Sequence, residues 1–152
     1  MHVKTRLGLM LAIAGASLLS AGCATLGPAY TPDSNAPRDK ATVYVYRSPA
    51  MGGAAVSYTV TVNGVDVSSL PSGGYFVYYA KPGENAFSAK TETTTSVTVD
   101  AKAGETYYVK GTIGMGVFVG HPHLVQVSND QGAQEVVKCK LVPPPASTTA
   151  AR

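Results

Sequence analysis

The alternation of apolar and polar side chains between Tyr75 and Lys110 constrains the fold of this chain more than any other feature. Side chains that alternate with a period of two lie on opposite faces of a strand. Pro82-Gly83 and Ala103-Gly104 interrupt the alternation and are typical of chain reversals. We therefore expect consecutive antiparallel strands with one apolar face each. The side chains expected on these faces are Phe76, Tyr78 and Ala80, then Phe87 and Ala89, then Val97 and Val99, then Tyr107, Val109 and Ile113.

Two more segments before this stretch have strand character. Ala41–Arg47 has apolar side chains on both faces, which predicts a strand inside a sheet and not at its edge. Val56–Val62 alternates valine or tyrosine with serine or threonine and leads into Asn63-Gly64. Asn-Gly between alternating runs predicts a two-residue hairpin, because a type I′ turn requires positive φ at both central positions.

After Lys110 the alternation is weaker. We expect a strand near Leu124–Val127, a turn at Ser128–Gly132 and a last strand at Gln134–Val142. No helical periodicity is apparent. The sequence therefore predicts an all-β fold, a small antiparallel β-sandwich of about 8–9 short strands at residues 41–142. In the last strand, the side chains expected on one face are Val137, Cys139 and Leu141.

The chain begins with the three parts of a secretory signal peptide. Lys4 and Arg6 give a basic start without acidic residues, Leu7–Leu19 is an uncharged apolar run, and small residues follow at 20–22. A membrane-spanning helix needs about 20 apolar residues, and this run is shorter. Residues 1–22 are therefore predicted to be a signal peptide that directs export.

The residues around the first cysteine, Leu19-Ser20-Ala21-Gly22-Cys23, resemble the lipobox of bacterial lipoproteins. The resemblance implies that Cys23 receives acyl chains such as palmitate and becomes the first residue of the mature protein. Each buried CH₂ adds about 0.8 kcal/mol, so two or three chains give stable attachment. Ala24 stands where aspartate commonly marks inner-membrane retention, which implies an outer-membrane lipoprotein facing the periplasm, with surface exposure left open. The alternative is an ordinary secretory signal that happens to contain a cysteine.

Both ends of the mature chain are expected to be mobile. Residues 23–40 contain three spaced prolines and no periodic apolar pattern, which predicts a flexible, polar tether that lets the domain stand off the lipid. Residues 143–152 begin with three prolines and continue mainly with small residues, which predicts a disordered tail.

The charge balance argues against one large class of partner. The chain carries 12 basic and 9 acidic residues, a formal net charge of +3. Because Lys4 and Arg6 are lost with the signal peptide, 10 of the 12 basic residues remain and the net charge falls to +1. Binding to nucleic acid depends on a strong positive charge, so we predict no nucleic-acid partner.

Three segments after the lipobox carry a resemblance to a known family. They are the opening strand Ala41–Arg47, the turn Lys81–Glu84 and the sequence Ala103–Lys110. Together they resemble a bacterial lipoprotein family of unknown function, DUF2846, roughly from Ala41 to Leu141. The resemblance implies an envelope β-sandwich and assigns no functional residue. The Pro-Gly turn is also distantly similar to PEGA-type and transthyretin-like modules, although Asn85 stands near the position where those usually have histidine.

The glycine-rich segment Gly111–Gly120 is the first candidate site. A phosphate-binding or dinucleotide-binding loop must open a helix, and the sequence predicts no helix here. Met115, Val117 and Phe118 lie among the glycines and form a candidate partner contact if they are exposed. In the alternative, the segment is a buried strand in which Val117 and Val119 share a face.

No metal, cofactor or catalytic site is expected. His121 and His123 could share a metal with Asp130 or Cys139, but closed zinc sites usually show a second spaced ligand pair, which this sequence lacks. A Gly-x-Ser-x-Gly motif is missing as well, and the acidic residues fall mostly at expected turns. We predict that the protein is not an enzyme. The acids at turns are Asp66, Glu84, Asp100, Glu105 and Asp130.

Cys139 is the one cysteine left for the folded domain if Cys23 carries lipid. Its alternation with neighbouring apolar residues predicts a small buried hydrophobe, and an intermolecular disulfide is the alternative.

Our first functional hypothesis is a lipid-anchored envelope module of the binding or accessory kind. It would contact the membrane through Cys23 and an envelope protein through a sheet face or Gly111–Gly120. One alternative is a peptidoglycan-binding or carbohydrate-binding module that uses exposed tyrosines, and another is an inhibitor of a wall-degrading enzyme. The tyrosines considered for this role are Tyr44, Tyr46, Tyr58, Tyr75, Tyr78, Tyr79, Tyr107 and Tyr108.

Overall fold

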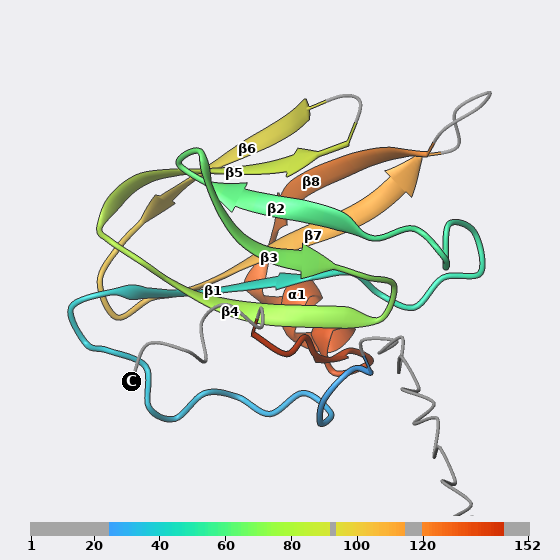
Figure 1. Ribbon diagram of the computed structural model, residues 1–152. Coiled ribbons are helices and arrows are strands. Elements are labelled where there is room, and N and C mark those ends of the chain that lie inside the picture. The colour runs from blue at the N-terminus through green and yellow to red at the C-terminus, as the bar shows by residue number, and fades with distance from the viewer. Residues whose placement is uncertain (1–24, 92–93, 115–119, 145–152) are drawn as a thin grey trace, which may run out of the picture.

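The computed structural model describes residues 25–91, 94–114 and 120–144, and it confirms the predicted β-sandwich (Figure 1). One sheet has five strands in the order β8-β7-β1-β4-β9, and the other has four in the order β3-β2-β5-β6. The elements are β1 (Ala41–Tyr46), β2 (Tyr58–Val62), β3 (Val65–Leu70), β4 (Gly74–Ala80), β5 (Gly83–Lys90), β6 (Thr94–Ala101), β7 (Thr106–Gly114), β8 (His121–Val127), α1 (Asn129–Val136) and β9 (Lys140–Leu141).

Two local predictions about the first strands are confirmed. β1 lies at the centre of the five-stranded sheet and all six of its residues are buried, as its two apolar faces predict. Asn63 and Gly64 join β2 to β3 with φ values of 50° and 82°. Both central positions of the hairpin therefore have the positive φ that favours Asn-Gly.

The pairing of the strands differs from the expected series of antiparallel neighbours. β5 and β6 do pair antiparallel, but β4 and β5 belong to different sheets, and so do β6 and β7. The turns at Pro82-Gly83 and Ala103-Gly104 thus carry the chain from one sheet to the other. In addition, β1 pairs parallel with β7, and β4 pairs parallel with β9. Alternation fixes which side chains face the core but leaves open which strands become neighbours.

The prediction of a last strand at Gln134–Val142 is wrong, because most of this segment belongs to α1 and the turn after it. The hydroxyl of Ser128 accepts a hydrogen bond from the backbone N–H of Gln131 at 3.3 Å and caps the helix. Gly132 and Val136, four residues apart, form its buried face. Val137 is 57% exposed and does not share a face with the buried Cys139.

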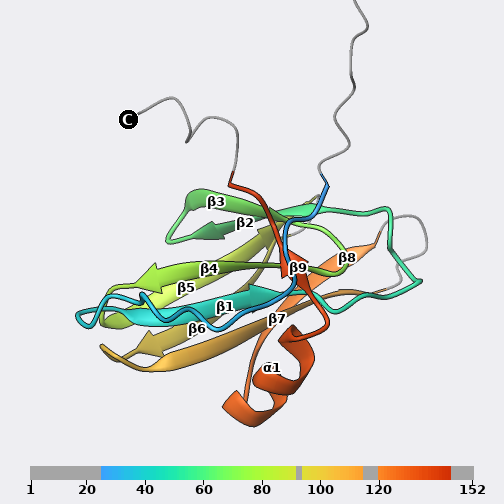
Figure 2. The ribbon, with the colours of Figure 1, turned by 90° about the horizontal axis from the view of Figure 1, so that it is seen from below.

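Two apolar cores hold the sandwich together. The larger one fills the space between the sheets and includes Val45, Val60, Phe87 and Val109. The second lies on the outer face of the five-stranded sheet, where α1 and the segment before β1 cover it (Figure 2). Its buried members are Tyr44, Tyr46, Tyr75, Tyr108, Val136 and Cys139.

Part of the predicted tether is packed on this second core. The Tyr30 ring contacts the rings of Tyr44 and Tyr75 edge-on, at 5.3 Å between centroids in both cases. The backbone N–H of Tyr30 donates to the carbonyl of Cys139 at 3.1 Å, and that of Gly27 donates to the carbonyl of Leu141 at 2.7 Å. Residues 27–30 therefore lie along the C-terminal segment of the domain.

Candidate functional site

A groove of about 640 Å³ opens at the end of the sandwich where the β2–β3 hairpin and the β4–β5 turn lie. This volume is within the range of small-ligand sites. One wall comes from the β2–β3 hairpin, and the other comes from β4, the β4–β5 turn, the first residues of β5 and the residue before β1. The lining residues are Lys40, Val62, Asn63, Val65, Val67, Tyr78, Tyr79, Lys81, Pro82, Glu84 and Asn85.

Hydrogen bonds of the β2–β3 turn and of the first residues of β5 fix the shape of this groove. Asn63 exchanges two bonds with Ala86, because its side-chain oxygen accepts from the Ala86 N–H and its own N–H donates to the Ala86 carbonyl, both at 2.9 Å. The buried side chain of Asn85 donates to the carbonyls of Lys81 at 2.9 Å and Gly83 at 2.8 Å. Both turns that border the groove are thus held by hydrogen bonds.

The lining combines an apolar strip with charged groups. Val62 is a buried member of the larger core, and Val67 and Tyr78 pack against that core. The Tyr78 ring contacts Phe87 edge-on at 5.7 Å. Val65 on β3 lies at the rim and is 66% exposed. Among the charged lining residues, two are lysines and one is a glutamate, so the groove favours a partner with a negative group.

The outer wall of the groove is supported by the segment before β1. The Tyr79 hydroxyl donates to the carboxylate of Asp33, and this bond raises the pKa of Tyr79 to about 12 and lowers the pKa of Asp33. The backbone N–H of Asp33 donates to the Tyr44 hydroxyl at 2.8 Å. Asp33 therefore links the segment to two residues of neighbouring strands.

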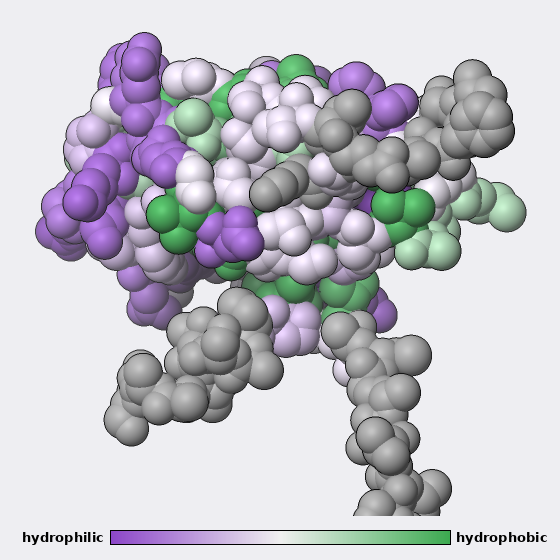
Figure 3. All heavy atoms as spheres, turned by 45° about the horizontal axis from the view of Figure 1, so that its top comes forward, coloured by the Kyte–Doolittle hydropathy of each residue, from purple (hydrophilic) through white to green (hydrophobic). Residues whose placement is uncertain are grey.

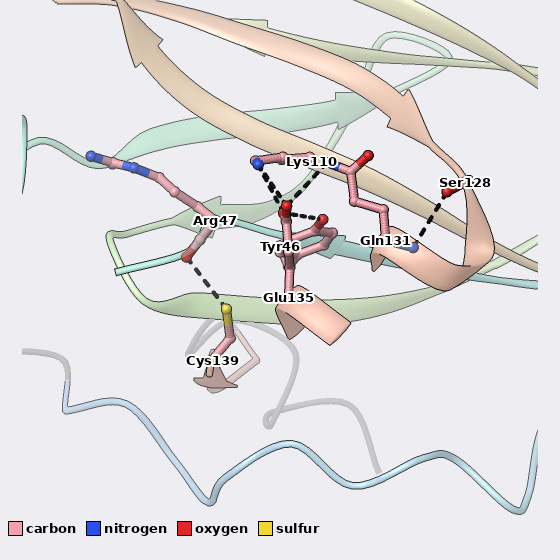
Figure 4. A network of polar contacts seen from close by, with 7 residues as sticks. All are labelled: Tyr46, Arg47, Lys110, Ser128, Gln131, Glu135 and Cys139. Carbon is pink, nitrogen blue, oxygen red and sulfur yellow. Dashed lines mark hydrogen bonds and ion pairs between the residues drawn. The ribbon is translucent and has the colours of Figure 1, made fainter. Parts of the chain in front are cut away.

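A second polar cluster lies between α1 and the outer face of the sheet (Figure 4). The Glu135 carboxylate accepts hydrogen bonds from Tyr46 at 2.8 Å and Gln131 at 3.0 Å, and it pairs with Lys110 at 2.8 Å. The hydrogen bond from Lys110, with those from Gln131 and Tyr46, lowers the pKa of Glu135 to about 2. Because several donors already occupy this carboxylate, the cluster acts as a clamp between α1, β1 and β7.

Cys139 and Arg47 are buried beside this clamp. The Cys139 thiol is 1% exposed and donates to the Arg47 carbonyl at 3.5 Å, and burial raises the pKa of Cys139 to about 11. Its predicted burial is confirmed, and a thiol with so high a pKa is a poor nucleophile. The Arg47 guanidinium donates to the carbonyls of Gly53 and Val56, both at 2.6 Å.

The candidate metal ligands are not brought together. His121 and His123 lie at the start of β8, whereas Asp130 follows the end of that strand in α1. Cys139 is buried in the second core. Within residues 25–91, 94–114 and 120–144, no group of three or more His, Cys, Asp or Glu side chains is arranged to hold a metal ion.

The remaining candidate residues fall into two groups. Cys23, Met115, Val117 and Phe118 lie outside the described residues, as does Val119. Among the eight candidate tyrosines, five are buried and only Tyr79 reaches 36% exposure. The row of tyrosines on the outer sheet face is covered by α1 and by the segment that contains Tyr30.

Sequence reasoning missed the groove because its walls come from turns about 20 residues apart whose pairing was not predicted. A local signal existed in Asn63-Gly64 and Pro82-Gly83, two exposed reversals that β2 and β5 place at the same end. Only the antiparallel pairing of β2 with β5 shows that these reversals are neighbours.

The fold and the groove define the class of the protein, a small two-sheet β-sandwich with an open groove at one end. The sequence model of DUF2846, described as a protein of unknown function, matches residues 37–122, and the chain belongs to this family. It is also similar to an uncharacterized protein of Haemophilus influenzae (strain ATCC 51907 / DSM 11121 / KW20 / Rd), with 26% identity over 137 residues that cover 85% of this chain and 81% of the relative. No helix in the described part of the chain has the length and apolar character needed to cross a membrane.

Proposed function

We propose that this protein is a lipid-anchored module of the bacterial envelope that binds an extended segment of a protein partner in the groove. The proposal rests on the position of the groove beside β3. This strand is at the edge of its sheet and pairs with β2 and with no other described strand. An unpaired strand edge offers backbone N–H and C=O groups that an incoming peptide can pair with. No catalytic step is part of the proposal.

The side chains beside this edge favour a peptide of mixed character. Val65 and Val67 on β3 offer an apolar strip, which suits alternate apolar side chains of an added strand. Lys40 and Lys81 lie across the groove and favour an acidic residue in the partner. The partner is therefore expected to present a short extended segment with apolar residues and at least one carboxylate.

Photo-crosslinking in intact cells tests this assignment. A photoreactive residue at position 65 is expected to give a discrete protein adduct, whereas one at Val125, an exposed valine on β8, is expected to give none. Lys81→Glu is expected to lower the adduct yield about tenfold, because a like charge then faces the acidic segment. Lys138→Glu, the same change at an exposed position after α1, is the matched control. Equal adduct yields from positions 65 and 125, or an adduct yield at position 65 that is unchanged by Lys81→Glu, would contradict the proposal.

A peptidoglycan or carbohydrate ligand is the second candidate, and the lysines and Tyr78 in a groove of about 640 Å³ favour it. The tyrosines on the outer face of the five-stranded sheet are buried, so a glycan ligand would have to bind in the groove. A glycan-binding protein is expected to co-sediment with purified sacculi and to lose that property with Lys81→Glu. An inhibitor of a wall-degrading enzyme is a form of the first proposal, with that enzyme as the crosslinked partner.

The proposed anchor makes its own prediction. Cys23→Ser is expected to move the protein from the outer-membrane fraction to the soluble periplasmic fraction and to abolish palmitate labelling, because a thiol is needed for acylation. Cys139→Ala, which removes the buried thiol of the domain, is expected to leave both properties unchanged. Membrane attachment of the Cys23→Ser protein would show that the anchor assignment is wrong.

A further inference from the structure

Residues 48–57, which follow Arg47 in the connection between β1 and β2, form a loop that presents apolar side chains to solvent although its backbone is held in place. Its sequence, SPAMGGAAVS, contains no charged residue. Met51 is 99% exposed, and Ala50, Ala54 and Ala55 are exposed beside it. The Arg47 guanidinium fixes the loop through the carbonyls of Gly53 and Val56, at 2.6 Å each. Together, Met51 and these alanines make a small exposed apolar patch on a loop that is held in place.

This loop lies at the end of the sandwich where the N-terminal segment joins the domain. A series of contacts connects them. Gly73 lies next to Pro49 of the loop, since a Cβ placed on Gly73 would be 3.4 Å from the Pro49 ring. The carbonyl of Gly73 accepts a hydrogen bond from the N–H of Lys140 at 2.9 Å, and Lys140 forms a β-bridge with Ala29. Figures 1 and 2 show both the loop and the start of the described chain toward the same end of the molecule.

The length of chain before this point limits how far the domain can stand from a lipid anchor. Gly27 is fixed to Leu141, and four residue steps separate it from Cys23. Fully extended, four steps span about 14 Å. With lipid on Cys23, the end of the sandwich that carries residues 48–57 is therefore held next to the membrane.

Two connections at the loop end of the sandwich lack charged residues, although Lys90 and Lys140 lie at the same end, beside Thr59 and Gly74. The connections β1–β2 and β3–β4 carry no charge at residues 48–57 and 71–73. The opposite end is charged. Figure 3 shows hydrophilic residues, in purple, gathered on the left of the molecule and moderately hydrophobic residues, in pale green, projecting on the right, where Figure 1 places the loop. The charged residues at or beside the turns of the opposite end include Lys40, Lys81, Glu84, Asp100, Lys102 and Glu105.

We propose that residues 48–57 form a second membrane contact, in which Met51 enters the boundary between headgroups and acyl chains of the bilayer that holds the lipid anchor. This inference rests on the proposed acylation of Cys23. The loop adds a fixed orientation to the attachment, because two contacts near one end of the sandwich hold its long axis away from the membrane plane. The groove then opens on the side away from the lipid.

A fluorescent probe tests this contact on the acylated full-length mature protein in vesicles of phosphatidylethanolamine and phosphatidylglycerol. Met51→Cys carries an environment-sensitive dye, and Ala103→Cys, in an exposed turn at the opposite end, is the matched control. The dye reacts only at the introduced cysteine, because Cys23 is acylated and Cys139 is buried. The dye at position 51 is expected to shift to shorter wavelength and to lose most of its emission to nitroxide-labelled lipids, and the dye at position 103 is expected to do neither.

The vesicles contain no other protein, so that a shift at position 51 can come only from lipid. If the protein floats with the vesicles while position 51 stays in water, the second contact is refuted and the anchor stands. If the protein does not float, the anchor is refuted and this inference falls with it. A shift that occurs in cells but not in vesicles shows that a protein covers Met51, which also overturns the proposal.

Discussion

Replacing Gly132 by alanine is expected to lower the free energy of unfolding by about 2–3 kcal/mol, although alanine is the better helix former. In an exposed helix the change would add about 1 kcal/mol of stability. Here α1 lies directly on the sheet, and a Cβ at this position would be 2.1 Å from Cγ of Tyr108. Overpacking of this kind costs about 1–3 kcal/mol and more where backbone must move. The helix has to withdraw and uncover the second core.

Thermal unfolding measures this effect, with an expected fall of about 10 °C in Tm for a domain of this size. Gly52→Ala is the matched control, because a Cβ there meets no atom within 4 Å. Its Tm is expected to stay within about 2 °C of the parent, as for most surface substitutions. Equal Tm values for Gly132→Ala and the parent protein would show that α1 does not pack on Tyr108 as described.

Replacing Glu135 by glutamine is expected to cost about 2 kcal/mol of stability at neutral pH and to weaken the response of stability to acid. In the folded protein the bonds from Lys110, Gln131 and Tyr46 lower the pKa of Glu135 from its ordinary value of 4.5 to about 2. A lowered carboxyl pKa contributes stability that is fully present above pH 4.5 and is lost as the pH falls toward 2. The glutamine variant lacks this contribution at every pH.

Urea unfolding at a series of pH values between 2 and 7 tests this expectation. The parent protein is expected to lose more stability than the Glu135→Gln variant between pH 4.5 and 2, so that the two curves converge in acid. Glu84→Gln, at an exposed position on the β4–β5 side of the groove, is expected to follow the parent curve. Parallel curves for Glu135→Gln and the parent would mean that the carboxylate contributes no pH-dependent stability.

The features that sequence reasoning predicted are those whose cause is local. The central position of β1 followed from apolar residues on both faces, and the β2–β3 hairpin followed from Asn63-Gly64. The burial of Cys139 was also predicted, although from a strand at Gln134–Val142 of which only Lys140–Leu141 is present. In each case the deciding property, such as a positive φ or a side chain without polar atoms, belongs to a few adjacent residues.

The helix was missed even though a signal for it was present. Ser128 and Gln131 have the spacing of a capping box, in which a serine cap is followed three residues later by glutamate or glutamine. The alternation of Val137, Cys139 and Leu141 masked that signal. In the structure the exposed Val137 ends α1, and only the residues after it return to the sheet edge as β9.

The parallel pairing of β1 with β7 and the groove could not be predicted in the same way. Both depend on which distant segments become neighbours, and the faces of a strand do not encode its partner. Asn63 and Ala86 illustrate this limit, because their paired hydrogen bonds close one wall of the groove although 23 residues separate them.

The packed segment around Tyr30 changes the reach of the module. A chain free from Cys23 to Lys40 could extend about 60 Å from the membrane, whereas docking at Gly27 reduces the free length to about 14 Å. With the proposed lipid at Cys23, the groove samples a thin layer above the bilayer and not a deep volume. Confinement to such a layer raises the effective concentration for partners at the same height and excludes those that stay farther away.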